Sequence, residues 1–183
     1  MRSLVLTGCV MAAALSPARA TDVEANKALY RHYIEDLWNK KDPAAPDRYL
    51  APDYVEHNTN LPPGLGGRKR FVATVLTAFP DYHAEILEVV AEGDRVVARV
   101  QFTGTNDGPY EGRPPTHNKL SFSTADFFRI AAGKIAEHWD VVNVLPRMIA
   151  LGQIQPPASA PKPPEDPAAK PRSSRLLKKC ATA

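Results

Sequence analysis

The apolar residues of the first quarter of the chain recur with a helical period. Between residues 23 and 38 they stand three, four or seven positions apart, as Val23, Tyr30, Tyr33, Ile34, Leu37 and Trp38. This spacing predicts an amphipathic helix that begins at a capping box formed by Thr21 and Glu24 and ends near residues 41–43. The next elements expected are a short helix over 44–50, an extended segment over 53–59 and a further helix over 68–79.

From residue 84 onward the hydrophobic period changes to two, which is typical of strands. The alternating segments cover residues 84–90, 95–103, 120–130 and 134–144, and short turns join them in pairs. Helices first and antiparallel strands afterwards predict an α+β fold, in which a strongly curved, mostly antiparallel sheet packs on the N-terminal helices.

The first twenty residues are typical of an export signal. Arg2 supplies a positive start, residues 4–15 an apolar core, and Ala18-Arg19-Ala20 an A-x-A cleavage site. The core is shorter than the roughly 20 residues that cross a bilayer. We therefore expect cleavage after Ala20, export to the periplasm or the medium, and no transmembrane span. The alternative is a lipoprotein anchored at Cys9.

The formal net charge of +3 comes from the two ends of the chain. Residues 1–20 carry +2 and residues 155–183 carry +4, whereas residues 21–154 hold 15 basic and 18 acidic side chains. A mildly acidic folded part argues against a nucleic-acid partner. The segment 155–183 contains seven prolines and few large apolar groups, so we expect a disordered basic tail behind one folded domain over 21–154.

Most familiar kinds of catalytic centre have no motif in this sequence. Cys9 and Cys180 both fall outside the predicted domain, which leaves it without a thiol nucleophile or a disulfide. The five histidines lack the spacing of a helical zinc site, and there is neither a phosphate-binding glycine loop nor a nucleophile elbow. We expect no metal and no cofactor, so general acid–base chemistry is the class that remains.

The last predicted strand carries the densest group of candidate side chains. Strand alternation places His138 and Asp140 on one face, and Trp139 and Asn143 on the other. On the preceding strand Asp126 could point inward, where an unpaired carboxylate would be costly.

Two other places carry polar side chains of interest. His57 stands beside Tyr54 and Asn58 ahead of a proline- and glycine-rich loop, where a surface or capping role is the commoner one for a lone histidine. The basic run Arg68-Lys69-Arg70 is expected to form the solvated face of the helix over 68–79.

A series of segments in a fixed order carries a resemblance to a known family. They are Trp38-Asn39, Tyr54-Val-Glu-His-Asn, Phe79-Pro-Asp-Tyr-His, Val90-Ala-Glu-Gly-Asp-Arg-Val, and the stretches 104–116, 127–140 and 151–152. Together they resemble the SnoaL-like polyketide cyclase (ester cyclase) family of the nuclear transport factor two-like superfamily, over nearly all of residues 24–154. The resemblance implies a cone-shaped α+β barrel, with helices on a curved sheet that encloses an apolar cavity.

The resemblance also implies a reaction. The characterised cyclases carry out a cofactor-free intramolecular aldol condensation, in which a carboxylate removes the acidic proton between two carbonyls. His57 matches the histidine of the family's Tyr-x-x-His-Asn segment, and Trp139 matches the tryptophan of the last long strand. The usual acid–base aspartate falls four residues after that tryptophan, where this chain has Asn143. Asn106 likewise replaces a histidine usual in the family.

An asparagine cannot accept a proton, so the usual base is missing at that position. We therefore expect His57 or Asp140 to be the base and Asn143 to be a hydrogen-bond donor. The side chains expected to line the substrate pocket are Trp38, Tyr54, Phe122, Asp126 and Trp139.

Three kinds of function follow from this interpretation. The first is an enzyme that acts by general acid–base chemistry on a small, hydrophobic, carbonyl-bearing molecule. The second is a binding module that holds such a ligand without turnover, which Asn143 favours. The third is an interaction protein, and in each case a homodimer through the sheet face is expected. Fold alone does not separate them.

Overall fold

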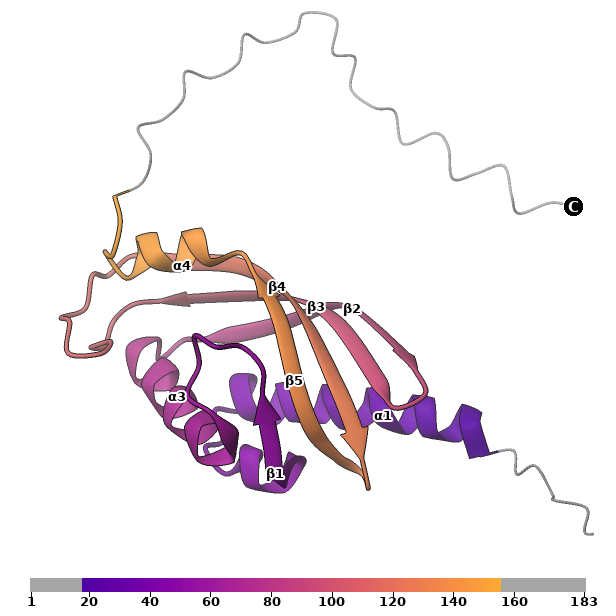
Figure 1. Ribbon diagram of the computed structural model, residues 1–183. Coiled ribbons are helices and arrows are strands. Elements are labelled where there is room, and N and C mark those ends of the chain that lie inside the picture. Colours follow the sequence, from indigo (N-terminus) through magenta and orange to yellow (C-terminus); the bar gives the residue numbers. More distant parts are fainter. Residues whose placement is uncertain (1–17, 156–183) are drawn as a thin grey trace, which may run out of the picture.

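The computed structural model describes residues 18–155 (Figure 1). The predicted signal peptide, apart from its last three residues, lies outside the described residues, and so do Cys9 and nearly all of the predicted tail. Export, lipidation and the disordered tail therefore stay predictions. No helix within the described part of the chain is long and apolar enough to cross a membrane.

The N-terminal half forms all but one of the described helices. They are α1 (Ala18–Ile34), a π-helical turn η1 (Glu35–Asn39), the short α2 (Ala45–Tyr49) and α3 (Gly64–Ala78), with strand β1 (Leu50–Glu56) between α2 and α3. Helix α1 begins three residues before the predicted capping box, because Ala18-Arg19-Ala20 are residues that favour a helix and extend it.

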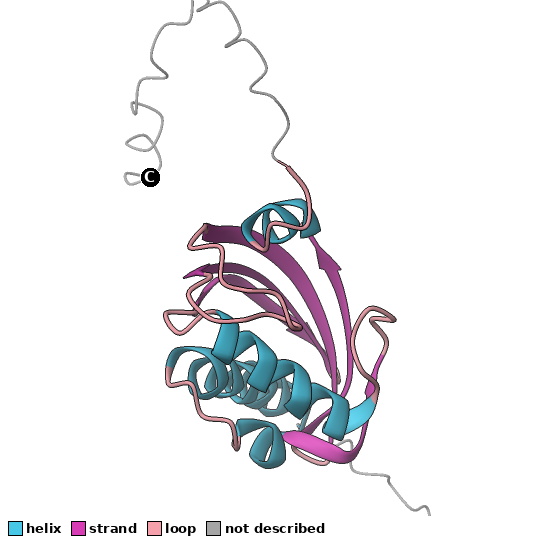
Figure 2. Cartoon of the chain, turned by 90° about the vertical axis from the view of Figure 1, so that its left-hand side faces the viewer, coloured by secondary structure: helices cyan, strands magenta, loops and turns pink. Residues whose placement is uncertain are grey.

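The C-terminal half forms the sheet. Strands β2 (His83–Glu92), β3 (Arg95–Thr105), β4 (Lys119–Ala131) and β5 (Lys134–Val142) follow one another as antiparallel neighbours, and β1 pairs with β5 in parallel. The spatial order is β1-β5-β4-β3-β2. The predicted α+β cone is confirmed, and the sheet curls over α1 and α3 without closing into a barrel (Figure 2).

The core lies between the concave face of this sheet and the helices. Alternate residues of β3 and β4 point inward, as their strictly alternating burial shows. They meet large side chains of α1 and η1, among them Tyr30, Tyr33, Leu37 and Trp38. The helical and strand periods in the sequence therefore correspond to the two layers of one core.

Helix α4 (Val144–Ala150) is an element that the sequence pattern does not predict. Strand β5 ends at Val142, two residues earlier than expected, and Asn143 becomes the residue that precedes the helix. Pro146 lies in the first turn of α4, where a proline is tolerated because its missing N–H has no partner there. The helix lies at the end of β5, against the sheet (Figure 1).

Asn106 fixes the long loop between β3 and β4 to the end of α3. Its side chain is 1 % exposed. The amide nitrogen donates to the carbonyls of Ala78 at 3.2 Å and Gly108 at 2.9 Å, and the amide oxygen accepts from the backbone N–H and the hydroxyl of Thr116, each at 3.0 Å. Asn106, which replaces a histidine usual in the family that the sequence resembles, therefore has a structural role in this protein.

Replacing this amide should destabilise the protein markedly. Asn106→Ala leaves buried carbonyl and N–H groups without partners, so we expect a loss of about 3 kcal/mol in the free energy of unfolding. Asn118→Ala is the control, because this exposed side chain makes one long hydrogen bond of 3.4 Å to the Ala150 carbonyl. Urea denaturation of both variants measures the difference, and equal losses would contradict the assigned role.

Candidate active site

An inner cavity lies between the concave face of the sheet and the helices, with a volume of about 60 Å³. Aromatic and aliphatic side chains form most of its wall, including Trp38, Phe79, Tyr82, Phe102 and Phe122. A smaller set of polar side chains also faces it: Asn58, Arg68, Thr124, Asp126, His138, Asp140 and Arg147. An apolar cavity with a few convergent polar groups is the usual form of a small-molecule site.

Two neighbouring strands bring the acidic groups of this cavity together. Asp126 of β4 stands directly opposite Asp140 of β5 in the antiparallel register, and both side chains point inward. His138 lies two residues before Asp140 on the same face, and its ring stacks on Phe128 with 4.6 Å between the centroids. The predicted pairing of His138 and Asp140 on one face is thus observed, and Asp126 joins them.

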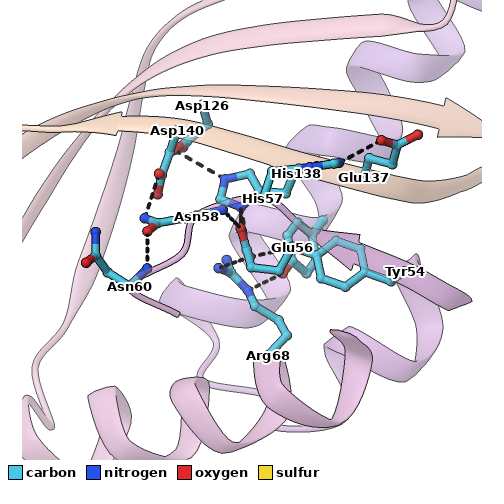
Figure 3. A network of polar contacts seen from close by, with 11 residues as sticks. Tyr54, Glu56, His57, Asn58, Asn60, Arg68, Asp126, Glu137, His138 and Asp140 are labelled. Carbon is cyan, nitrogen blue, oxygen red and sulfur yellow. Dashed lines mark hydrogen bonds and ion pairs between the residues drawn. The ribbon is translucent and has the colours of Figure 1, made fainter. Parts of the chain in front are cut away.

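The parallel pairing of β1 with β5 supplies a carboxylate beside His138 (Figure 3). The Glu56 side chain has no exposed surface, and its two oxygens lie 2.9 and 3.0 Å from His138 Nδ1. The other ring nitrogen, Nε2, faces Asp126 Oδ1 at 3.7 Å, which is an ionic contact rather than a hydrogen bond. His138 is thereby held between two carboxylates.

These contacts set the protonation state of His138. Its burial disfavours the charged imidazolium, but the Asp126 and Glu56 carboxylates favour it more strongly, so the pKa of His138 is raised above its ordinary value. The pKa of Glu56 is lowered in turn, because His138 outweighs the effect of burial on the carboxyl. His138 and Glu56 therefore form a buried ion pair.

Arg68 completes the charge balance around Glu56. Its guanidinium lies 3.8 Å from a Glu56 oxygen and donates from Nε to the Tyr33 hydroxyl at 3.2 Å. The expectation that Arg68 belongs to a solvated face is wrong. The helical period of α3 places Arg68 in line with Val72 and Val75, four and seven residues later, and this line faces the core.

Asp140 is the carboxylate at the neck of the cavity, which is the place where the cavity meets a wider outer cleft. Its Oδ1 accepts a hydrogen bond of 2.7 Å from the Asn58 side-chain amide. Partial burial raises the pKa of Asp140 above its ordinary value, because burial disfavours the ionised carboxyl, and Asp126 adds to the increase. Three carboxyls thus share a small space with two cationic groups, His138 and Arg68.

Asp126, His138 and Asp140 also offer one possible ligand atom each within 4.8 Å of one another. The sequence pattern suggested only two such groups, because the third comes from a neighbouring strand. His138 Nε2 already faces Asp126, and Asp140 already accepts from Asn58. These contacts satisfy one atom of each group, and the expected absence of a metal stays a prediction.

A wider outer cleft of about 570 Å³ adjoins the neck of the cavity. The two share Asn58, Asp140, Val142 and Arg147 in their linings. Of these two spaces, His57 and Trp139 line only the outer cleft, where their rings stack in parallel with 4.3 Å between the centroids. His57 Nε2 also lies 2.8 Å from Glu137 Oε2, on the convex side of the sheet.

The structure thus divides the predicted site residues. Trp38, Phe122 and Asp126 line the inner cavity, and Asp140 lines both spaces. His57 and Trp139 do not reach the inner cavity, because the alternation that turns His138 and Asp140 inward turns Trp139 outward.

The remaining two predicted residues do not line the inner cavity either. Tyr54 is buried, but it donates at 2.7 Å to Glu56 instead of facing the space. Asn143 is exposed ahead of α4, because β5 has already ended.

Sequence reasoning gave no role to six polar side chains of the site, although it placed His138 on the correct face: Glu56, Asn58, Arg68, Thr124, His138 and Arg147. Helical alignment of Arg68 with Val72 was a usable signal. Glu56 gave no such signal, since its contact with His138 spans 82 residues of sequence.

Comparison with known proteins identifies the relatives of this fold and site. The model of the SnoaL-like polyketide cyclase family matches residues 27–151. Aklanonic acid methyl ester cyclase DnrD of Streptomyces peucetius is 33% identical over 112 residues, which cover 59% of this chain and 74% of DnrD.

Solved structures agree with this match. AclR of Streptomyces galilaeus, a proposed hydroxylase, superposes with a TM-score of 0.66 at 30% identity, over 72% of this chain and 98% of AclR. A proposed SnoaL-like polyketide cyclase from Jannaschia sp. CCS1 also gives a TM-score of 0.66, over 78% of this chain and 100% of its own. At 23% identity that likeness concerns the fold alone.

The assigned role of Glu56 can be tested through the titration of His138. Glu56→Gln keeps the size of the side chain but removes its charge, so the pKa of His138 should fall toward or below its ordinary value. Glu137→Gln is the matched control, because Glu137 contacts His57 and not His138. NMR titration of the imidazole protons measures both, and an unchanged His138 pKa in Glu56→Gln would contradict the ion pair.

Proposed function

The chain belongs to the SnoaL-like polyketide cyclase family, and from that premise we propose that it catalyses a cofactor-independent, intramolecular aldol-type cyclisation of a small hydrophobic carbonyl compound. The observation that carries the proposal is the group of Asp126, His138 and Asp140 facing one apolar cavity. Such chemistry needs a base, a proton donor and a dry space, and it needs no bound ion.

Asp140 is the base in this proposal. It is the one of the two cavity aspartates that also borders the outer cleft, so a substrate entering from there meets it first. Its hydrogen bond to Asn58 fixes one carboxylate oxygen and leaves the other free to accept a proton. Burial brings the pKa of Asp140 closer to the pKa of a C–H group between two carbonyls, so the proton transfer is less unfavourable.

His138 and Thr124 are the groups that stabilise the enolate. The imidazolium of His138 is oriented by Glu56 at Nδ1, which leaves its Nε2–H on the side of Asp126 and the cavity. The Thr124 hydroxyl is buried, lines the same cavity and has no hydrogen-bond partner among the described residues. A buried hydroxyl without a partner is costly, so a ligand oxygen is a favourable partner for it.

The reaction then proceeds in three balanced steps. Asp140 takes a proton from the carbon between two carbonyls, and the electron pair of the broken C–H bond moves into an enolate that His138 stabilises. The enolate carbon attacks a second carbonyl of the same molecule, so that a C–C bond forms while the π bond of that carbonyl breaks and its electron pair moves onto oxygen. The new alkoxide oxygen then receives a proton from the cluster, which holds the proton taken by Asp140, so the aldol ring closes without loss or gain of atoms.

The two adjoining spaces accommodate this chemistry together. The inner cavity of about 60 Å³ is much smaller than the roughly 300–1,000 Å³ of typical ligand pockets. The outer cleft of about 570 Å³ meets it at Asp140. In the proposed complex the reacting end of the substrate lies at the neck and the remainder occupies the cleft, whose lining includes the stacked rings of His57 and Trp139.

Two observations favour an enzyme over a binding module. DnrD is named as a cyclase, and the matching family is described as polyketide cyclases. The argument for a binding module was that Asn143 replaces the usual base. Because Asn143 lies outside the inner cavity while Asp140 lines it, that replacement does not leave the cavity without a carboxylate.

Removing the Asp140 carboxylate should abolish most of the activity. With the methyl ester of the linear tetraketide precursor of orsellinic acid as the probe, Asp140→Asn should lower kcat by roughly 10²–10⁴-fold, because the variant has no group to accept the proton. The cyclised aldol of this probe loses one molecule of water to become methyl orsellinate, and the absorbance of that aromatic ester follows ring closure. Asp53→Asn, an exposed aspartate of β1, should keep the full rate.

Two results would count against this assignment. One is an Asp140→Asn variant that turns over as fast as the wild-type protein. The other is a His57→Ala variant that loses as much rate as Asp140→Asn, since that would move the base to the convex side of the sheet.

The activity should depend on pH in a bell-shaped manner. It should rise as Asp140 ionises, at a pH above the ordinary carboxyl value of 3.8, because burial raises this pKa. It should fall as His138 loses its proton, at a pH above the ordinary value of 6.5. The two apparent values belong to the coupled cluster. A kcat/KM profile measures both limbs, and activity that keeps rising into alkaline pH would contradict the need for an imidazolium.

A further inference from the structure

Arg147 is the charged residue that borders every space around the neck. It lies in α4 and lines the inner cavity and the outer cleft. It also lines a side depression of about 100 Å³, together with Arg70, Tyr110 and Glu111. Asn58 and Asp140 border only the first two of these spaces. A molecule that enters from the outer cleft toward the inner cavity therefore passes the guanidinium.

The Arg147 guanidinium has no ion-pair or hydrogen-bond partner among the described side chains, those of residues 23–155. The ion pairs and side-chain hydrogen bonds of the described residues do not include Arg147, although Asp140 and Glu111 lie on linings that it shares. Arg147 is only partly exposed. An arginine offers five N–H donors in a planar fork that matches a carboxylate. Half-buried and unpaired at the neck, this fork is placed to receive an anionic group.

Charges of opposite sign lie along the entrance to this otherwise apolar cavity. Arg147 lines the outer cleft and the cavity, Asp140 lies at the neck, and Asp126 lines only the inner cavity. Together with Glu56 behind His138, these carboxylates outnumber the buried cations Arg68 and His138 by one. A carboxylate on a substrate is attracted by Arg147 and repelled by the carboxylates, so the substrate enters with its neutral, enolisable end first. The same charge pattern that admits the substrate also orients it.

We propose that the substrate of this site carries a carboxylate, which Arg147 binds at the rim while the enolisable carbon reaches Asp140. This inference rests on the proposed function, because it specifies the substrate class of the same site. The proposed substrate differs from the one in the name of DnrD, because a methyl ester has no charge for Arg147 to bind.

A matched pair of stable aromatic ligands tests the inference. Orsellinic acid and methyl orsellinate differ only in the carboxylate, and both resemble a cyclised product. In isothermal titration calorimetry on the full chain, the acid should bind roughly ten- to hundredfold more tightly than the ester, as expected for a charge-assisted pair. Arg147→Gln should remove this preference by weakening the acid and leaving the ester unchanged.

Arg70→Gln is the matched control. Arg70 is exposed and lines the side depression but neither the inner cavity nor the outer cleft, so its loss removes the same charge nearby and should leave the preference intact. A circular dichroism melt confirms that each variant is folded.

Each outcome decides the inference separately from the proposed function. Equal affinities for acid and ester in the wild-type protein, or a preference that survives in Arg147→Gln, would overturn the inference. So would binding of neither ligand. In those cases the cyclisation of the tetraketide ester still decides the proposed function, because that assay does not depend on a carboxylate in the substrate.

Discussion

The buried carboxylate of Glu56 is the constraint around which this site is organised. A charge with no exposed surface is tolerated only when it is paired and hydrogen-bonded, and removing a partner from such a pair costs several kcal/mol. Glu56 meets that requirement with contacts from three parts of the chain: Tyr54 beside it on β1, Arg68 on α3 and His138 on β5. The first strand, the third helix and the last strand are thereby held in one arrangement.

The geometry of the proposed catalytic group follows from the same pairing. Because Glu56 occupies Nδ1 of His138, only Nε2 is left to face Asp126. The parallel register of β1 and β5 fixes this contact, and the antiparallel register of β5 and β4 fixes Asp126 opposite Asp140. One parallel and one antiparallel pairing therefore bring four side chains together: Glu56, His138, Asp126 and Asp140. Strand pairing, more than any single loop, determines where the charged side chains of the cavity lie.

The parts of the structure that could be predicted from sequence are those with a local cause. Hydrophobic periods predicted the first three helices and the two hairpins, and strand alternation placed His138 and Asp140 together and Trp139 on the opposite face. The positions that the sequence pattern did not place have distant causes. Glu56 is paired across 82 residues, and Asn143 leaves the sheet because α4 begins at the next residue. His57 was assigned a central role by resemblance, but stacking on Trp139 holds it on the convex side.

The short connection between β5 and α4 has a consequence for the size of molecule that this fold can take. The proposed base and the proposed anion-binding guanidinium lie on one continuous stretch of chain, Asp140 near the end of β5 and Arg147 in the last turn of α4, which begins two residues after the strand. Their separation is set by backbone geometry rather than by flexible loops. The length of this stretch therefore determines the distance between the reacting carbon and the carboxylate of a substrate that both residues can bind. A relative with one residue more or fewer between strand and helix would accept a substrate of a different length.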